Sequence, residues 1–209
     1  MSLEDIEKAI CEAGSDNHEI FGGIWTGGYL IQQDPKEFAQ LIQCLEQHAP
    51  HGDWLSIGIA AGGNERFIFE QDFVFGDLFV IDNGEHPNHK HWAENKKAIV
   101  HHPDSILQEF IGDSHSQACK EWLESWSKFV PQRFAVIGID GDHSPEGVLQ
   151  DWELVQPYLA PGAIVWVHDI RMDIPGQHGA RKLWQRLKTQ YEVLLETDGK
   201  CGIGVLRVP

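Results

Sequence analysis

Apolar and polar positions alternate along the chain with two different periods, and the switches between them predict its elements. From residue 53 onward, short continuous apolar runs are separated by longer stretches in which apolar residues recur every three or four positions. The short runs predict strands at residues 54–59, 77–82, 106–111, 134–139, 163–167, 191–195 and 202–208. The longer stretches predict helices at residues 90–100, 118–129, 145–159 and 181–190. This alternation indicates an α/β fold, a Rossmann-like three-layer sandwich around a seven-stranded, mainly parallel sheet.

Two connections refine this prediction. The last two strands are joined by the four residues TDGK at 197–200, which are too few for a crossover, so we expect a C-terminal antiparallel hairpin. Residues 66–75, RFIFEQDFVF, lie where a crossover helix should follow the first strand, yet their aromatic and β-branched side chains favour a strand. The first crossover is therefore expected to be short and less helical than the others.

The N-terminal quarter carries a well-marked helix start. Asp34 is an N-cap residue, Pro35 suits the first helical position, and Glu37 is the expected capping-box partner. Apolar residues then recur at i, i+3, i+4 and i+7 from Phe38 to Leu45, which predicts an amphipathic helix. We expect a single domain over residues 1–209, in which residues 1–50 form a helical lid or oligomer arm on a core at residues 51–209.

Composition narrows the function classes. The 209 residues carry a formal net charge of −16, and we see no basic stripe, so nucleic acid is not an expected partner. No apolar run approaches the roughly 20 residues that span a bilayer, and the acidic N-terminus does not resemble a signal peptide, so the expected location is the cytoplasm, away from membranes. The four cysteines lack CxxC spacing and are expected as reduced core thiols.

Each of the first five predicted strands ends on glycine-rich or polar sequence. These endings are Gly58 to Gly63, Asp82-Asn83, Gly112-Asp113-Ser114, Asp140 to His143, and His168-Asp169. Because ligands of open α/β sheets bind beyond the carboxyl ends of the strands, we expect the five endings to form one pocket. Small residues in the first turn let the backbone approach a ligand closely, and Asp82, 20 residues beyond Gly62, suits a carboxylate that binds a ribose diol.

With these endings in sequence, the chain resembles the class I S-adenosylmethionine-dependent methyltransferases. The resemblance covers roughly residues 53–208 and is strongest to the small-molecule O-methyltransferase branch, which includes catechol-type and cephalosporin-hydroxylase-like enzymes (methyltransferase family 24-like). It rests on WLSIGIAAGGN, FVIDN, FIGDS, the GARKLW helix and the most specific stretch, IDGDHSPEGVLQDWELVQPYLAPGA. It implies a methyl transfer from S-adenosylmethionine to a small-molecule substrate, at an oxygen atom.

The family pattern also implies roles for individual residues. Cofactor-binding roles fall on Gly58, Ala60, Gly62, Gly63, Asp82, Asp113, Ser114 and Asp140. The glycine turn would lie under the cofactor's amino-acid portion, Asp82 at the ribose hydroxyls, Asp113 and Ser114 at the adenine edge, and Asp140 beside the sulfonium.

The metal-dependent branch implies two further roles at the last strand ends. A divalent cation, Mg²⁺ or Mn²⁺, would be bound by Asp140, His168 and Asp169, where it would orient the acceptor and lower the pKa of its hydroxyl. His143, together with Asp140, occupies the catalytic position and can act as the base, since a histidine titrates near neutrality.

Three departures from the pattern leave alternatives open. Ser56 stands where the family has an acid before the glycine turn, His168 replaces a commoner oxygen ligand, and the first crossover is short. The alternatives are a metal-independent enzyme that methylates nitrogen or carbon, and a non-catalytic nucleotide-fold module that binds a partner. A nicotinamide-dependent dehydrogenase is a weaker alternative, because the first turn lacks a full GxGxxG. A homodimer is a further expectation.

Simpler interpretations compete for several side chains. His143 could cap the helix after it, and His168 could be a core histidine with satisfied hydrogen bonds. A second group of histidines is expected on a solvated loop and is left outside the site: His86, His89, His91, His101 and His102. Four carboxylates are expected on solvated helix faces: Glu121, Glu124, Asp151 and Glu153.

Overall fold

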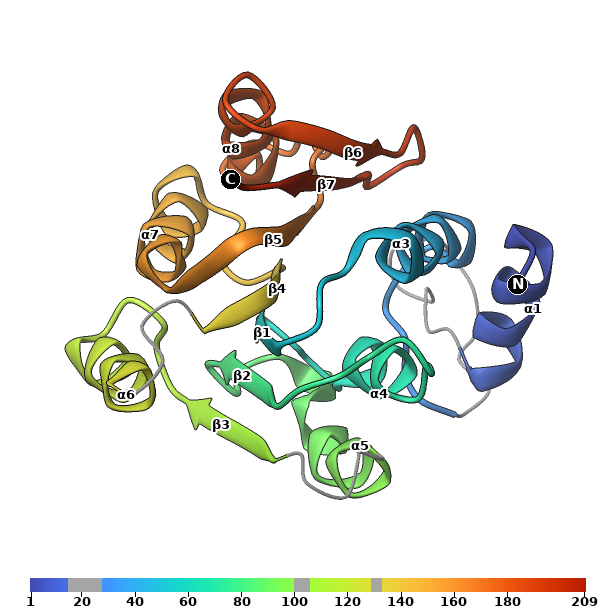
Figure 1. The fold of residues 1–209 in the computed structure, drawn as a ribbon, viewed down its shortest axis with the longest axis horizontal. Coiled ribbons are helices and arrows are strands. Elements are labelled where there is room, and N and C mark those ends of the chain that lie inside the picture. Colours follow the sequence, from blue (N-terminus) through green and yellow to red (C-terminus); the bar gives the residue numbers. More distant parts are fainter. Residues whose placement is uncertain (15–27, 100–105, 129–132) are drawn as a thin grey trace.

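The computed structural model describes residues 1–14, 28–99, 106–128 and 133–209, and its centre is one seven-stranded sheet (Figure 1). The strand order is β3-β2-β1-β4-β5-β7-β6. The strands are β1 (Asp53–Ile57), β2 (Leu78–Asp82), β3 (Leu107–Ile111), β4 (Phe134–Ile139), β5 (Leu159–His168), β6 (Glu192–Glu196) and β7 (Ile203–Arg207). The predicted fold class, an α/β Rossmann-like sandwich, is confirmed.

Strand direction follows the length of each connection. β1 to β5 pair in parallel, and each parallel neighbour is reached through a crossover. β7 pairs antiparallel with both β5 and β6, so it lies between them. The predicted C-terminal antiparallel hairpin is therefore confirmed.

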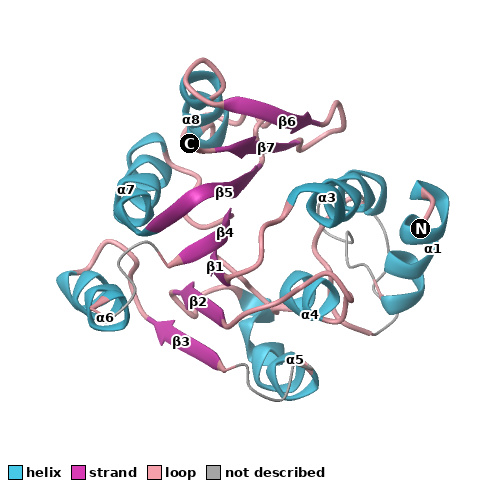
Figure 2. Ribbon diagram, viewed as in Figure 1, coloured by secondary structure: helices cyan, strands magenta, loops and turns pink. Residues whose placement is uncertain are grey.

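Helices cover both faces of the sheet (Figure 2). α1 (Leu3–Ala13), α3 (Pro35–His48), α4 (Gly63–Phe69) and α5 (Trp92–Ala98) lie on one side, and α6 (Gln117–Ser127), α7 (Pro145–Val155) and α8 (Gly179–Leu187) on the other. Two short 3₁₀ helices, η1 (Pro87–His91) and η2 (Gln156–Tyr158), precede α5 and β5. Each face has its own apolar core, one around Phe38, Trp54 and Trp166, the other around Phe79, Trp152 and Trp184.

The start of α3 differs from prediction in one side chain. Asp34 caps the helix as expected, since its Oδ1 accepts from the N–H groups of Lys36 and Glu37 at 3.0 Å. Glu37 does not complete a capping box. Its buried carboxylate accepts from the Thr197 hydroxyl at 3.0 Å and from the Gly202 N–H at 3.1 Å. Glu37 therefore joins α3 to the β6–β7 connection, a contact across 160 residues that no local pattern contains.

The strand preference of residues 66–75 is wrong for the first part of that segment. Residues 66–69 lie in α4, where Phe67, Ile68 and Phe69 are all buried. Burial against the sheet outweighs the strand preference of these side chains, because tertiary packing contributes more to the free energy of folding than intrinsic strand propensity does. The expectation of a short crossover is confirmed, since α4 has seven residues.

Other boundaries moved by a few residues. The helix predicted at 145–159 ends at Val155, and Pro157 lies in η2, after which β5 starts at Leu159, four residues before prediction. The expected helix ends at residues 100 and 129 lie outside the described residues. All four cysteines are free, but Cys11 is exposed, so the expectation of a core position is wrong for it. Within the described ranges, no helix is both long and apolar enough to cross a bilayer.

Candidate functional site

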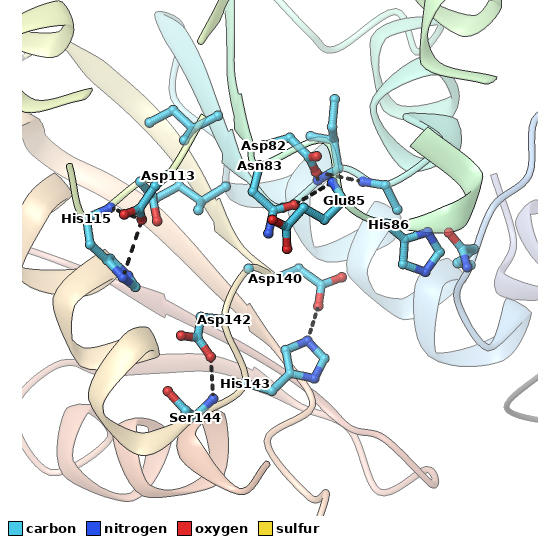
Figure 3. A pocket seen from close by; sticks show the side chains of 18 of the residues that line it. Asp82, Asn83, Glu85, His86, Asp113, His115, Asp140, Asp142, His143 and Ser144 are labelled. Carbon is cyan, nitrogen blue, oxygen red and sulfur yellow. Dashed lines mark hydrogen bonds and ion pairs between the residues drawn. The ribbon is translucent and has the colours of Figure 1, made fainter. Parts of the chain in front are cut away.

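A cavity of about 870 Å³ lies at the carboxyl ends of the first four strands (Figure 3). Its walls come from the segments after β1, β2, β3 and β4, with Leu30 and Gln32 from the N-terminal part and Gln177 from the loop before α8. The acidic lining residues are Asp82, Glu85, Asp113, Asp140 and Asp142. None of its described lining residues is Lys or Arg, so the electrostatic character of the cavity favours a cationic ligand.

Gly58 shapes the turn after β1. Its φ is +77°, and a Cβ there would lie 2.1 Å from the carbonyl oxygen of Asp140, so no other residue fits without moving the β4 end. Gly58 and Ala60 line the cavity as predicted. Gly62 and Gly63 are not among its lining residues. A Cβ on Gly62 would meet the Trp92 ring at 2.2 Å, so that glycine is required by internal packing.

Asp82 fastens this turn to the end of β2. Its Oδ2 accepts from the N–H groups of Ile59 at 2.8 Å and Ala60 at 3.1 Å. Its Oδ1 accepts from Gly84 N–H at 2.7 Å and lies 3.0 Å from His89 Nδ1. A carboxylate has about four acceptor directions, and backbone N–H groups occupy three of them, while His89 Nδ1 lies close to Oδ1 without a hydrogen bond among the described residues. Asp82 lines the cavity, but its first role in this structure is to hold the turn.

A buried acid, Asp151, holds the turn after β3 through its side-chain contacts. Ser114 Oγ donates to Asp151 Oδ1 at 2.7 Å, and His115 Nε2 lies 3.1 Å from the same oxygen. The expectation of a solvated Asp151 is wrong, because its side chain is fully buried in α7. Asp113 and Ser114 reach the cavity as predicted, and Asp113 Oδ1 also accepts from the backbone N–H of His115 at 2.9 Å.

Four predicted residues meet beyond β4 and β5. His168 Nδ1 lies 3.1 Å from Asp140 Oδ1 and 3.4 Å from Asp169 Oδ1. His143 bridges the same two acids, with Nε2 3.6 Å from Asp140 Oδ1 and Nδ1 3.2 Å from Asp169 Oδ2. Asp140 and His143 line the cavity and point toward each other in Figure 3. His168 and Asp169 are buried and are not among its lining residues.

The charges of this cluster shift one another's pKa values. Burial opposes a charge on His168, but the neighbouring Asp140 carboxylate raises the pKa of that imidazole to about 9. Burial likewise opposes the charge of Asp140, and the two histidines hold its pKa well below its usual range. Hydrogen bonding to Asp140 raises the pKa of His143 against the effect of burial. The cluster therefore favours carboxylates balanced by cations, either imidazolium or a bound ion.

The donor set at this end is compatible with a divalent cation. Asp140, His143 and Asp169 offer ligand atoms within 4.8 Å of one another, and so do His168, Asp169 and Cys201. Asp169 belongs to both groups, and its buried Oδ1 lacks a hydrogen-bond partner among the described residues. An acceptor left over in this way is what a cation could occupy. Carboxylate with imidazole suits Mn²⁺ or Zn²⁺ as well as Mg²⁺.

In the turn after β4, Asp142 and Ser144 stabilise the start of α7. Asp142 Oδ1 accepts from Ser144 N–H at 2.7 Å, and the Ser144 hydroxyl accepts from Gly147 N–H at 3.0 Å at the start of α7. Ser144, and not His143, is therefore the cap of that helix.

Some residues that line the cavity or contact its walls carry no recognised signal in the sequence. Gln33 Nε2 donates to Asp140 Oδ2 at 3.2 Å from the segment before α3. Glu85 and His86 line the cavity after β2, and His89 contacts Asp82, so the expectation of a purely solvated histidine group is wrong for these two histidines. His101 and His102 lie outside the described residues. Asp82 followed closely by histidines was the available signal, but spacing alone does not show which imidazoles turn inward.

Comparisons with known proteins agree with this architecture. A family model described as a methyltransferase domain matches residues 54–170, more than half of the chain. No curated protein matches the sequence.

Solved structures resemble the whole chain at low identity. An O-methyltransferase from Bacillus cereus in complex with S-adenosylhomocysteine is 16% identical with a TM-score of 0.59, over 99% of this chain and 90% of that one. The O-methyltransferase TomG from Streptomyces achromogenes, in complex with S-adenosylmethionine, is 18% identical with a TM-score of 0.59, over 96% and 89%. MycE methyltransferase, in complex with Mg and S-adenosylhomocysteine, is 14% identical with a TM-score of 0.58, over 99% and 54%.

Proposed function

Because the chain belongs to the methyltransferase-domain family, which its residues 54–170 match, we propose that it transfers a methyl group from S-adenosylmethionine to an oxygen of a small molecule. The observation that carries the proposal is the acidic cavity of about 870 Å³ at the ends of four parallel strands. Its volume suits a nucleoside with a small acceptor beside it. Its excess of carboxylates suits a cofactor with a sulfonium and an ammonium. Similar folds bind S-adenosylmethionine or S-adenosylhomocysteine, which supports the same cofactor here.

The cofactor would lie across the carboxyl ends of the strands. Its amino-acid portion would contact Gly58 and Ala60, its adenine the Asp113–Ser114 turn, and its sulfonium the vicinity of Asp140. The ribose role of Asp82 stays a prediction, since protein groups already approach both oxygens of that carboxylate. Gly62 and Gly63 would act indirectly, by allowing the close packing that shapes the turn.

The transfer itself needs alignment and the removal of one proton. The acceptor oxygen forms a bond to the methyl carbon as the carbon–sulfur bond breaks, and the acceptor's hydroxyl proton passes to a base. His143 lies on the cavity wall, and its side chain is about one-third exposed. Its pKa is raised by the hydrogen bond to Asp140, so the share of neutral imidazole that can accept a proton should increase with pH. Replacement of His143 by Ala should therefore remove an alkaline rise from the pH–rate profile, and an unchanged profile would exclude the base role.

A divalent cation would be held by Asp140 and Asp169 with an imidazole of His143 or His168. When bound, such an ion would orient the acceptor's oxygens and lower their pKa values. The MycE structure contains Mg, which supports the idea for this fold. In this chain Asp140 also accepts from Gln33 and contacts His168, so its orientation is maintained from two sides.

The N-terminal segment would cover one side of the cavity. Leu30 and Gln32 line it, and a Cβ on Gly63 would lie 2.3 Å from the Tyr29 carbonyl, so this segment packs directly on the start of α4. This supports a lid role within a single domain of 1–209. A homodimer through the N-terminal segment stays a prediction.

Calorimetric titration with S-adenosylhomocysteine tests the proposal. We expect binding in the micromolar range, and the absence of heat at high micromolar ligand would overturn the methyltransferase function. The titration is repeated with Mg²⁺, Mn²⁺ and a chelator, and with Asp169→Ala. Binding and turnover that ignore both the metal and this substitution would leave a metal-independent enzyme. Binding without turnover on a panel of hydroxylated acceptors would favour the alternative of a non-catalytic module.

A further inference from the structure

Glu65, in the first turn of α4, is a buried acid without a full set of partners. Its side chain is 1% exposed, and its Oε2 has no hydrogen-bond partner among the described residues. The preceding residue, Asn64, lines the cavity, and its buried Oδ1 also lacks a partner within the described ranges. Among the described residues, Asn64 thus presents an unpaired acceptor at the cavity, and the next residue in the chain, Glu65, which is not itself a lining residue, has an unpaired carboxylate oxygen. A ligand group with positive charge or N–H donors would compensate such acceptors.

The surroundings of Glu65 make an isolated negative charge costly. Burial raises the pKa of its carboxyl to about 8, against the opposing effects of its own backbone N–H and the Ser56 side chain. The charged groups that act on it, Asp140 and Asp82, are both acidic and raise its pKa further. Without a cation nearby, a pKa of about 8 favours the protonated form of Glu65 at neutral pH. A cation in the cavity would favour the loss of that proton.

Glu65 is an acid close to the position where the sequence pattern lacks one. Ser56, in β1, stands where an acid usually precedes the glycine turn in enzymes that this chain resembles. Glu65 reaches the same place from the helix that follows the turn, since its carboxyl has the Ser56 side chain as a hydrogen-bonding neighbour. The carboxyl group absent from the strand is thus replaced by one from α4.

We propose that Glu65 is the counter-charge for the ammonium group of the bound cofactor, and that cofactor binding releases the Glu65 proton to solvent. The inference rests on the proposed function, because the ammonium belongs to the methionine portion of that cofactor. Glu65 acts from beneath the cavity lining, through a desolvated region where electrostatic attraction is strong. It does not take part in the methyl transfer step.

Calorimetry in buffers of different ionisation enthalpy tests the inference, because the buffer dependence of the heat counts protons released. At pH 7, S-adenosylhomocysteine should release up to about one proton from the wild-type protein. 5′-Methylthioadenosine, which keeps the nucleoside and sulfur but lacks the amino acid, should release fewer. In Glu65→Gln the difference between the two ligands should vanish, and the affinity for S-adenosylhomocysteine should fall about tenfold while that for 5′-methylthioadenosine stays the same.

Ser56→Ala is the second variant, and it keeps the test decisive if Glu65→Gln does not fold. Removal of the hydroxyl that stabilises the carboxylate should leave more Glu65 protonated at pH 8, so S-adenosylhomocysteine should release more protons there than from the wild type. Equal proton counts in the wild type and the variants, with S-adenosylhomocysteine still bound, would overturn the inference. Failure of the wild type to bind either ligand would instead overturn the proposed function.

Discussion

Asp82 holds the turn after β1, and this role can be tested by a substitution that removes the negative charge of the side chain while leaving its shape almost unchanged. In Asp82→Asn, one carboxylate oxygen becomes an amide NH₂. The amide oxygen can keep the N–H groups of Ile59 and Ala60 or that of Gly84, but not both sets. The N–H groups that lose their acceptor then face the amide NH₂, which is also a donor. Water cannot easily replace the lost acceptor, because Asp82 is only 6% exposed.

The expected cost follows from these contacts. A buried N–H left without an acceptor costs about 1–3 kcal/mol, and the remaining bonds lose the benefit of a charged acceptor. We therefore expect Asp82→Asn to lower the free energy of unfolding by about 3 kcal/mol. For a domain of this length, about 2–4 °C per kcal/mol converts this to a fall in Tm of about 6–12 °C.

The assay is thermal unfolding followed by circular dichroism, with Asp113→Asn as the matched control. Asp113 undergoes the same chemical change at the next strand end, but its side chain is 69% exposed and accepts from one backbone N–H, which an amide oxygen can also serve. Its Tm should change by less than about 2 °C, as for other surface substitutions. A fall below about 2 °C in Asp82→Asn, or equal falls in both variants, would refute the anchoring role.

Three further predictions concern stability. Gly58→Ala should lower the free energy of unfolding by about 2–5 kcal/mol, because its Cβ would meet the Asp140 carbonyl at 2.1 Å, whereas Gly162→Ala, with the same φ of +77° and no atom within 4 Å, should cost only about 1 kcal/mol in chemical denaturation. Glu37→Gln should lower Tm by roughly 2–8 °C through weaker bonds to the β6–β7 connection, and no change would contradict that contact. In metal-free buffer the raised pKa of His168, about 9 against 6.5 unfolded, contributes stability that is complete below pH 6.5 and is lost as the pH rises through 9, so Tm should fall over this range in the wild type and less in His168→Gln.

Much of the fold was predictable because the information is local. The period of the apolar positions distinguishes strands from helices, and a four-residue connection cannot cross over a sheet, so the terminal hairpin followed from chain length alone. The same locality explains the errors. Phe67, Ile68 and Phe69 favour a strand by their intrinsic preference but are buried as part of a helix. Asp151 is expected on a solvated face because its partners, Ser114 and His115, come from another strand end and no local pattern contains them.

The candidate site divides in the same way. The linear order of residues shows that polar residues follow each of the parallel strands, and the geometry of a sheet requires those ends to meet at one edge. The contacts of each group follow from the folded chain: Asp82 holds a backbone turn, and His143 bridges two acids. It also buried Glu65 with the Ser56 side chain as a hydrogen-bonding neighbour. These roles depend on burial and on partners from distant segments, and a linear pattern contains neither the dielectric environment of a side chain nor the identity of its neighbours.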